Sequence, residues 1–337
     1  MTTVERARIF QYAFPLRYPL PLKSSRITAR QGLILELTDN QGVTAYGEAS
    51  PLPDFSQESL AASRSLLIKT VSQLVENHWG TGYQHPWLLP VTSVAFAIES
   101  ALWGLNLAQY KQSPETAPLL TGTSYTINKR LSSWPTPFPR EFKFKVGRQP
   151  LHKDIEQVMS ILGRLPSSSK LRLDANQHWN PQQLIDFSKA IDVHRIAYIE
   201  EPVPKSNIFP ELFRRTGIYY ALDESLQHYH PIQMMSGLRA LIIKPTLTGG
   251  LHYCHQLIRR AKQQGIRAVL SSSFESPLGI HVLQQLAAHW LPDEMAGLDT
   301  LTAFHSDCPL FSLPSSGCPF PDHVIKQLDL ICQFPSH

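Results

Sequence analysis

The chain has 337 residues, of which 42% are hydrophobic and 17% are charged, so it can build a sizeable core and is not a disordered protein. The net charge of +4 comes without a block of Lys and Arg, which argues against nucleic acid as a partner and suits a small anionic substrate. No apolar run approaches the roughly 18 residues of a membrane span, and the first 20 residues lack the apolar core of a signal peptide. We therefore expect a cytoplasmic protein without a membrane partner, either a monomer or a small homo-oligomer.

The first part of the chain predicts a small α+β domain. Strand-like runs lie at 7–16 and 32–53, and "TDNQG" between the two halves of the second run is typical of a hairpin turn. Apolar residues at helical spacing follow at 57–76 and 92–109. We place this domain at residues 1–114.

From residue 115 the pattern changes to short apolar runs that end abruptly in polar residues. Successive ends lie about 21 to 29 residues apart, close to the length of a strand, a helix and two loops. Strands alternating with helices predict a parallel sheet. A first strand at "TAPLLTG" brings the number of strand–helix units to eight. This number favours a closed (β/α) barrel over residues 115–302, with an open doubly wound sheet as the alternative.

Three of the predicted strands end in a carboxylate, at Asp174, Glu200 and Asp223. The carboxyl ends of all barrel strands meet at one face, so these side chains should converge there. Three unpaired carboxylates repel one another and require a cation. Oxygen ligands select a hard ion, which predicts Mg²⁺, with Mn²⁺ as an alternative.

Lysines lie on the predicted strand before the three that end in carboxylates and on the strand after them. Lys143 and Lys145 alternate with Phe142 and Phe144 in "EFKFKV", so both should lie on one face of a strand, and Lys244 ends the strand that follows the carboxylates. A neighbouring cation lowers the pKa of a lysine, and the pair can thus produce an amine base. A base beside Mg²⁺ predicts removal of a proton next to a carboxylate, with the metal stabilising the enediolate.

The chain resembles the o-succinylbenzoate synthase family, in the muconate-lactonising subgroup of the enolase superfamily. The resemblance rests on "KFK" (143–145), "LDANQHW" (173–179), "IEEP" (199–202), "LDES" (222–225), "IIKPTLTGG" (242–250), "SSSFESPLG" (271–279), "GLDTL" (297–301) and "YGEASPLPDFSQES" (46–59). It implies an α/β fold, a (β/α)7β TIM-like barrel with an α+β capping domain completed by the tail at 303–337.

The resemblance also implies a reaction and the roles of six residues. The reaction is the dehydration of 2-succinyl-6-hydroxy-2,4-cyclohexadiene-1-carboxylate to o-succinylbenzoate in menaquinone biosynthesis. Asp174, Glu200 and Asp223 would bind Mg²⁺, and for the "IEEP" motif we choose Glu200 over Glu201 on this ground. Lys145 would act as the base and Lys143 would tune it. Lys244 would stabilise the intermediate.

Further residues are predicted to line the substrate site. Ser272 and Ser273 end a strand and can hydrogen-bond the succinyl tail, whereas Arg26, with Arg30, can close over an anion from the capping domain. Asn176 lies on the same strand face as Asp174.

Other functions remain open on the sequence. An N-acylamino acid racemase or a dipeptide epimerase of the same superfamily would use the same lysines. A Schiff-base aldolase would need a lysine but not three carboxylates, and a non-catalytic barrel would need neither.

Overall fold

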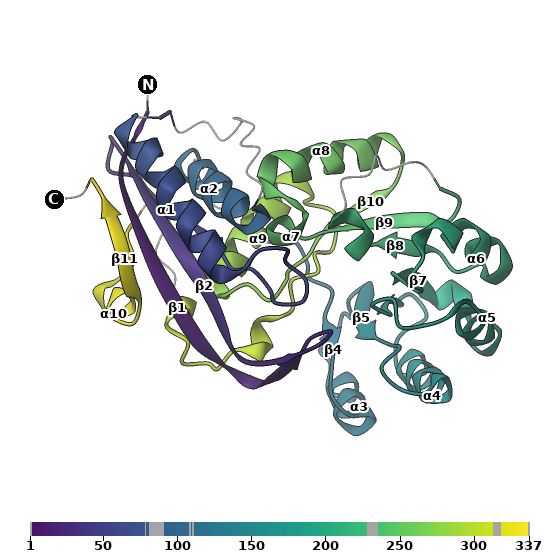
Figure 1. Cartoon of the computed structure of the whole chain (residues 1–337). Coiled ribbons are helices and arrows are strands. Elements are labelled where there is room, and N and C mark those ends of the chain that lie inside the picture. Colours follow the sequence, from purple (N-terminus) through teal and green to yellow (C-terminus); the bar gives the residue numbers. More distant parts are fainter. Residues whose placement is uncertain are drawn as a thin grey trace.

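The computed structural model describes residues 2–77, 79–80, 91–107, 109, 111–227, 235–312 and 318–335. Two sheets organise these residues, an antiparallel sheet in the order β11-β1-β2-β3 and a parallel sheet in the order β10-β9-β8-β7-β6-β5-β4 (Figure 1). The strands are β1 (Val4–Pro21), β2 (Arg26–Asp39), β3 (Thr44–Ala49), β4 (Leu119–Leu120), β5 (Glu141–Lys145), β6 (Lys170–Asp174), β7 (Ile196–Glu200), β8 (Tyr220–Leu222), β9 (Leu238–Ile243), β10 (Arg267–Leu270) and β11 (Asp329–Phe334).

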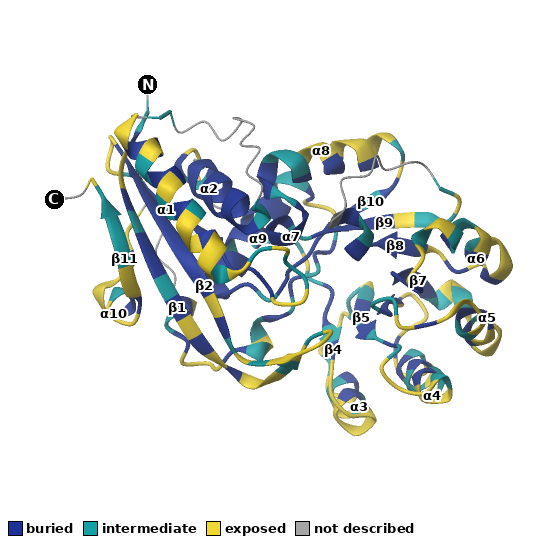
Figure 2. Ribbon diagram, in the orientation of Figure 1, coloured by how far each residue is buried: buried dark blue, intermediate teal, exposed yellow. Residues whose placement is uncertain are grey.

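Helices cover the outside of the parallel sheet and one face of the antiparallel sheet (Figures 1 and 2). They are α1 (Leu60–Glu76), α2 (Thr92–Leu105), α3 (Ser124–Ser132), α4 (Leu151–Leu162), α5 (Pro181–Ala190), α6 (Phe209–Thr216), α7 (Pro245–Thr248), α8 (Gly250–Gln263), α9 (Pro277–Trp290) and α10 (Asp322–Ile325). Among the described residues, no helix has the length and apolarity needed to cross a membrane. Cys254, Cys308, Cys318 and Cys332 are free thiols.

The antiparallel sheet forms the capping domain. The hairpin predicted at "TDNQG" joins β2 to β3, with Thr38 paired to Thr44. Helices α1 and α2 pack on one face of this sheet, and the core there includes Leu35, Leu67 and Ile98. The strand β11, from the tail of the chain, pairs with β1. The cap is therefore built from two regions that lie far apart in the sequence.

The parallel sheet curls into a barrel, which confirms the predicted fold class. Strands β5, β6 and β7 end at the predicted residues Lys145, Asp174 and Glu200. Beyond β10 and β4, isolated parallel bridges join Ser271 to Gly297 and Thr116 to Ala296. The predicted eighth strand is thus reduced to a short segment around residues 296–297, but it closes the ring and excludes the open doubly wound sheet.

An ion-pair network fills the barrel at the amino ends of its strands. Arg172 is 1% exposed, and its guanidinium contacts Glu141 and, at 2.9 Å, Glu294. Arg267 contacts the same two carboxylates at 2.9 and 2.6 Å. Burial acts to raise the pKa of Glu141, but Arg267 and Arg172 outweigh it and lower that pKa to about 2. The network joins β5, β6 and β10 to the segment that closes the barrel.

Replacing Glu141 with glutamine is expected to lower the free energy of unfolding by roughly 3 kcal/mol, because the buried guanidinium of Arg172 and the partly buried one of Arg267 lose a shared carboxylate. A carboxyl group whose pKa is lowered on folding stabilises the protein above its unfolded pKa, and this contribution fades as the pH falls. The difference in the free energy of unfolding between the wild type and Glu141→Gln should therefore become smaller as the pH falls from 5 to 3. Denaturant unfolding at several pH values measures this difference. Glu156→Gln, which removes a carboxylate 61% exposed from its pair with Lys153, is the control and should change little.

Candidate active site

Strand β5 carries two lysines on the inner face of the barrel. Phe142 and Phe144 are buried in the core between strands and helices, whereas Lys143 and Lys145 alternate with them and line a cavity at the carboxyl end of the strand. The predicted alternation is therefore correct. The strand holds both cations on the side where the barrel opens.

Three carboxylates lie at the ends of the next strands. Asp174 and Glu200 are the last residues of β6 and β7 and are paired neighbours, and Asp223 directly follows β8. Each carboxylate residue is only 2% exposed. Strand register also pairs Lys145 with Asp174. The barrel therefore brings the predicted acids and lysines into one group.

Each carboxylate of this group contacts a lysine. The Nζ atom of Lys143 lies 2.5 Å from an oxygen of Glu200 and 3.2 Å from one of Asp174. Lys145 Nζ lies 3.5 Å from Asp174. Across the ring, Lys244 Nζ lies 2.5 Å from Asp223. Lys145 thus makes the longest of these ion pairs.

The surroundings of the two lysines of β5 shift their pKa values in opposite directions. Burial lowers the pKa of Lys145, and the cations Lys143 and Arg148 lower it further against the opposing effect of Asp174. For Lys143 burial acts in the same direction, but the contacts with Asp174 and Glu200 outweigh it and raise the pKa above its ordinary value. Lys145 is therefore the lysine whose surroundings favour the neutral amine.

The donor chemistry of the three carboxylates fits a hard divalent ion. Burial raises the pKa of Glu200 to about 7, and the nearby charges of Asp174 and Asp223 act in the same direction. Such crowding is relieved by a cation among the oxygens. Within the described residues no three Asp, Glu, His or Cys side chains are grouped closely enough to hold a metal as they stand. The ammonium groups of Lys143 and Lys244 contact the carboxylates instead.

Glu200 and Glu201 have different surroundings in the structure. Glu200 faces the lysines, whereas Glu201 has a φ of 40° and its carboxylate accepts hydrogen bonds from the backbone of Asp223 and Ser225, both at 2.9 Å. It also accepts from the side chain of Gln177 at 3.1 Å. Glu201 therefore braces the loops after β6 and β8, which leaves Glu200 as the acid of this motif that lies in the site.

Asn176 lines the cavity and also contacts Lys145, the predicted base. Its Oδ1 accepts a hydrogen bond of 3.3 Å from Lys145, and its Nδ2 donates at 3.1 Å to Glu224. Glu224 is buried, its other carboxylate oxygen has no partner among the described residues, and burial raises its pKa to about 7. Sequence reasoning missed Glu224. Its place beside Asp223 in "LDES" was the available signal.

A cavity of about 410 Å³ opens above the lysines. Ser272 and Ser273 both line it, as predicted, and are buried. Their hydroxyl groups have protein partners, Thr300 at 2.9 Å for Ser272 and Glu275 at 2.6 Å for Ser273. Both serines therefore contribute to the cavity wall.

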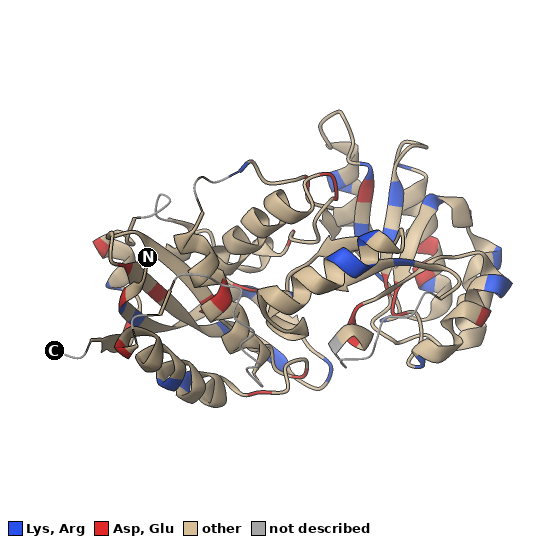
Figure 3. Ribbon diagram, turned by 90° about the horizontal axis from the view of Figure 1, so that it is seen from above, with Lys and Arg blue, Asp and Glu red and all other residues tan. Residues whose placement is uncertain are grey.

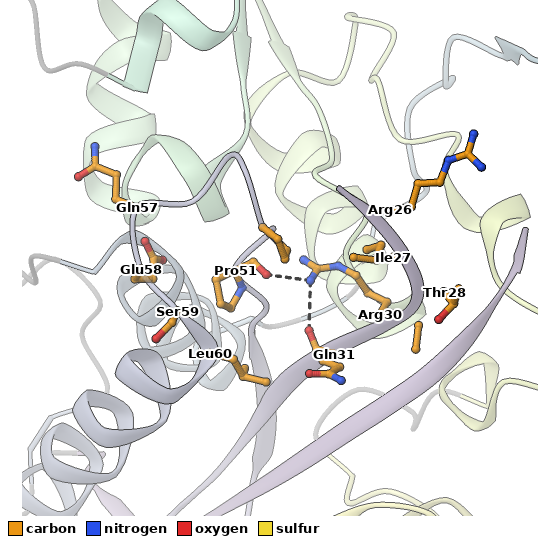
Figure 4. Close-up of a pocket in the computed structure, with 12 residues that line it drawn as sticks. Arg26, Ile27, Thr28, Arg30, Gln31, Pro51, Gln57, Glu58, Ser59 and Leu60 are labelled. Carbon is orange, nitrogen blue, oxygen red and sulfur yellow. Dashed lines mark hydrogen bonds between the residues drawn. The ribbon is translucent and has the colours of Figure 1, made fainter. Parts of the chain in front are cut away.

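The arginine expected over the substrate lies elsewhere. Arg26 lines a separate hollow between the start of β2 and residues 51–60, and Arg30 is fully engaged with backbone carbonyl groups there (Figure 4). The guanidinium side chains that line the cavity are those of Arg17 and Arg148. The sequence analysis missed both, although Arg148 follows Lys145 closely in "KFKVGR".

Two sequence families match the chain. Residues 138–309 match "Enolase C-terminal domain-like" and residues 4–105 match "MenC, N-terminal domain". An o-succinylbenzoate synthase of Yersinia enterocolitica is 34% identical, and the alignment covers 96% of this chain and 98% of the relative.

Solved structures with related folds include an o-succinylbenzoate synthase and an epimerase. The synthase is from Thermosynechococcus elongatus, with a TM-score of 0.69 and 24% identity over 89% of this chain and 94% of that chain. The other is the L-Ala-D/L-Glu epimerase of Bacillus subtilis, with a TM-score of 0.73 and 22% identity over 91% and 92%.

A capped barrel with lysines on both sides of three strand-end carboxylates defines an enzyme of the enolase superfamily. Both matching families and the fold agree with this class. Within it, the full-length similarity is specific, and the chain belongs to the o-succinylbenzoate synthase family. This family is the one that the sequence motifs indicated.

Proposed function

We propose that the protein converts 2-succinyl-6-hydroxy-2,4-cyclohexadiene-1-carboxylate into o-succinylbenzoate, a step towards menaquinone, with Mg²⁺ as its cofactor. The observation that supports this most strongly is the position of Lys145 at the cavity floor, beside the strand-end carboxylates and with a lowered pKa. The synthases among the relatives support the choice of substrate. The relative from Thermosynechococcus elongatus, described with Mg in its active site, supports the choice of ion.

Asp174, Glu200 and Asp223 would hold the ion, because they are the buried oxygen donors of the site. When bound, Mg²⁺ supplies positive charge to the ring carboxylate of the substrate and makes the adjacent proton more acidic. The protein contributes the base. Neutral Lys145 takes the proton from the carbon that carries the carboxylate, and Asn176 holds its amine in place.

The rest of the reaction follows from the substrate. The electron pair of the broken C–H bond becomes a new ring double bond as the neighbouring C–OH bond breaks. The departing hydroxide takes the proton from Lys145 and leaves as water, so the base is restored. Lys244, whose pKa is raised because Asp223 outweighs the effect of burial, remains a cation across the ring and stabilises negative charge on the substrate.

An assay with the purified protein tests this function. Incubation with substrate and Mg²⁺ should produce o-succinylbenzoate, seen as a change in ultraviolet absorbance when the ring becomes aromatic. Removal of divalent ions with EDTA should stop the reaction, and added Mg²⁺ should restore it. An aromatic product formed at the same rate in EDTA would contradict the metal assignment.

A racemase or epimerase is the second candidate, because Lys145 and Lys244 both line the cavity and lie on opposite sides of the carboxylates. Such an enzyme removes a proton from one face of a carbon and returns it to the other. Assays with N-acylamino acids and with dipeptides distinguish the two functions. Racemisation without any dehydration would overturn our first choice.

Arg148 is expected to bind the second carboxylate of the substrate, at the end of the succinyl tail. Replacing it with glutamine should raise KM roughly ten-fold, because a contact of similar strength in the ground state and the transition state is lost. It should lower kcat by a smaller factor, because the pKa of Lys145 rises when this neighbouring cation is removed. Steady-state kinetics measures this split. Arg26→Gln is the matched control, since Arg26 lines the separate hollow and should leave KM unchanged. Equal effects of the two substitutions would contradict the assignment.

A further inference from the structure

The capping domain contacts the barrel at the loop between β10 and α9. Four consecutive residues of this loop, Ser271 to Phe274, line the active-site cavity. The loop then continues through Glu275 and Ser276 into α9, which begins at Pro277. Anything that fixes this loop also fixes one wall of the cavity.

Glu48, from β3 of the cap, binds the amino end of α9. It is 0% exposed and accepts hydrogen bonds from the backbone N–H of Ser276 and of Gly279, both at 3.0 Å. The hydroxyl of Ser276 also donates to it, and the hydroxyl of Tyr12 donates at 2.7 Å. A carboxylate suits this place because the first N–H groups of a helix have no partner within it and carry partial positive charge. Four donors therefore converge on one buried cap carboxylate.

Arg30, from β2 of the cap, binds the middle of the same loop. Its Nε donates at 2.9 Å to the carbonyl oxygen of Phe274, a residue with a φ of 61°. The other nitrogens donate to carbonyl groups of the cap, Gln31 at 3.1 Å and Pro51 at 2.9 Å (Figure 4), and also to Ser50. Arg30 is 1% exposed. The cap thus holds Phe274 in a backbone conformation that phenylalanine rarely adopts.

Hydrogen bonds within the barrel also hold this loop. Glu275 accepts from the backbone of Ser273 at 2.7 Å and from the hydroxyl of Thr246, after β9, at 2.7 Å. The loop therefore lies between contacts within the barrel and the two buried cap side chains. Removing the cap contacts would leave the position of Phe274 to the barrel contacts alone.

We propose that Glu48 and Arg30 are positioning residues for the active site, through which the cap fixes the cavity wall formed by residues 271–274 against the substrate. The kinetic part of this inference rests on the proposed synthase function. Neither side chain lines the cavity above the lysines, so both act through the loop. A loosened wall weakens the fit of the substrate more than it changes the base, which is held by β5.

The test compares Glu48→Gln with a matched control, Glu36→Gln. Glu36 is also a buried cap glutamate, 1% exposed, but its partners Arg8 and Tyr46 belong to the cap. We expect Glu48→Gln to raise KM at least ten-fold with kcat reduced less than three-fold. Hydrogen exchange measured by mass spectrometry should show faster exchange of the backbone amides of residues 271–280. Glu36→Gln should lower thermal stability without either change.

Two milder variants keep the test decisive if Glu48→Gln does not fold. Ser276→Ala removes one donor to Glu48, and Arg30→Lys keeps the charge but loses the planar group that reaches several carbonyls at once. Each variant should accelerate hydrogen exchange in residues 271–280, and the variant with the larger increase in exchange should also have the larger increase in KM. Unchanged exchange and KM in these folded variants would overturn the proposal, as would equal effects from Glu36→Gln. The exchange measurement separates this result from failure of the synthase function, since it needs no substrate.

Discussion

Replacing Lys145 with alanine is expected to lower kcat by at least roughly a thousand-fold, because the site loses the base that takes the substrate proton. The protein should remain folded, since this side chain contributes one long ion pair with Asp174 and one hydrogen bond with Asn176. It should also still bind o-succinylbenzoate. Steady-state kinetics, circular dichroism and calorimetric titration with the product measure the three quantities.

Lys145→Arg provides a sharper comparison for the same position. Arginine keeps the positive charge and much of the side-chain volume but does not lose its proton at accessible pH. If Lys145 acts as a base, arginine should be as inactive as alanine. If it acts only as a cation, arginine should restore much of the activity. Activity within ten-fold of the wild type in either variant would refute the assignment.

Replacing Asp223 with asparagine is expected to have the second large effect. The change removes the charge of one of three oxygen donors and leaves Lys244 without its 2.5 Å partner. Turnover should fall at least roughly a hundred-fold, since neither the ion that binds the substrate carboxylate nor Lys244 is then held in position. The Mg²⁺ concentration that gives half-maximal activity should rise.

A titration of the remaining activity with Mg²⁺, alongside a thermal melt, measures this prediction. The control is Asp186→Asn, which removes a carboxylate 47% exposed from its pair with Lys189 and should change neither quantity. A folded Asp223→Asn protein with wild-type turnover at the same Mg²⁺ concentration would contradict the role given to this residue.

The barrel could be predicted from the sequence because its signals are local and repeated. Each unit pairs a short apolar run with a polar strand end, so Lys145, Asp174 and Glu200 were placed at the ends of β5, β6 and β7 from the sequence pattern alone. An eighth barrel strand was predicted, whereas the structure has only the bridges around residues 296–297. A strand shortened in this way still carries an apolar run, so its sequence resembles that of its neighbours.

The acids and lysines of the site were likewise predictable, but the arginines that line the cavity were not. The acids and lysines lie on strands whose alternation fixes their direction, whereas Arg17 and Arg26 lie on the β1–β2 hairpin. The pairing of that hairpin shifts register between Pro15 and Leu20, so the face on which each arginine lies cannot be counted along the sequence. The contact of Glu48 with Ser276 joins residues 228 positions apart, and no local pattern reveals it.

The pairing of β11 with β1 has a consequence for the order in which the protein forms during synthesis. β1 ends at Pro21 and its partner begins at Asp329, so nearly the whole barrel is translated between them. Until β11 emerges, β1 is the edge of the cap sheet, and an exposed edge strand can pair with another chain. Ribosome-bound chains that lack β11 therefore carry an open strand edge, and the pairing of β11 with β1 removes this site of aggregation.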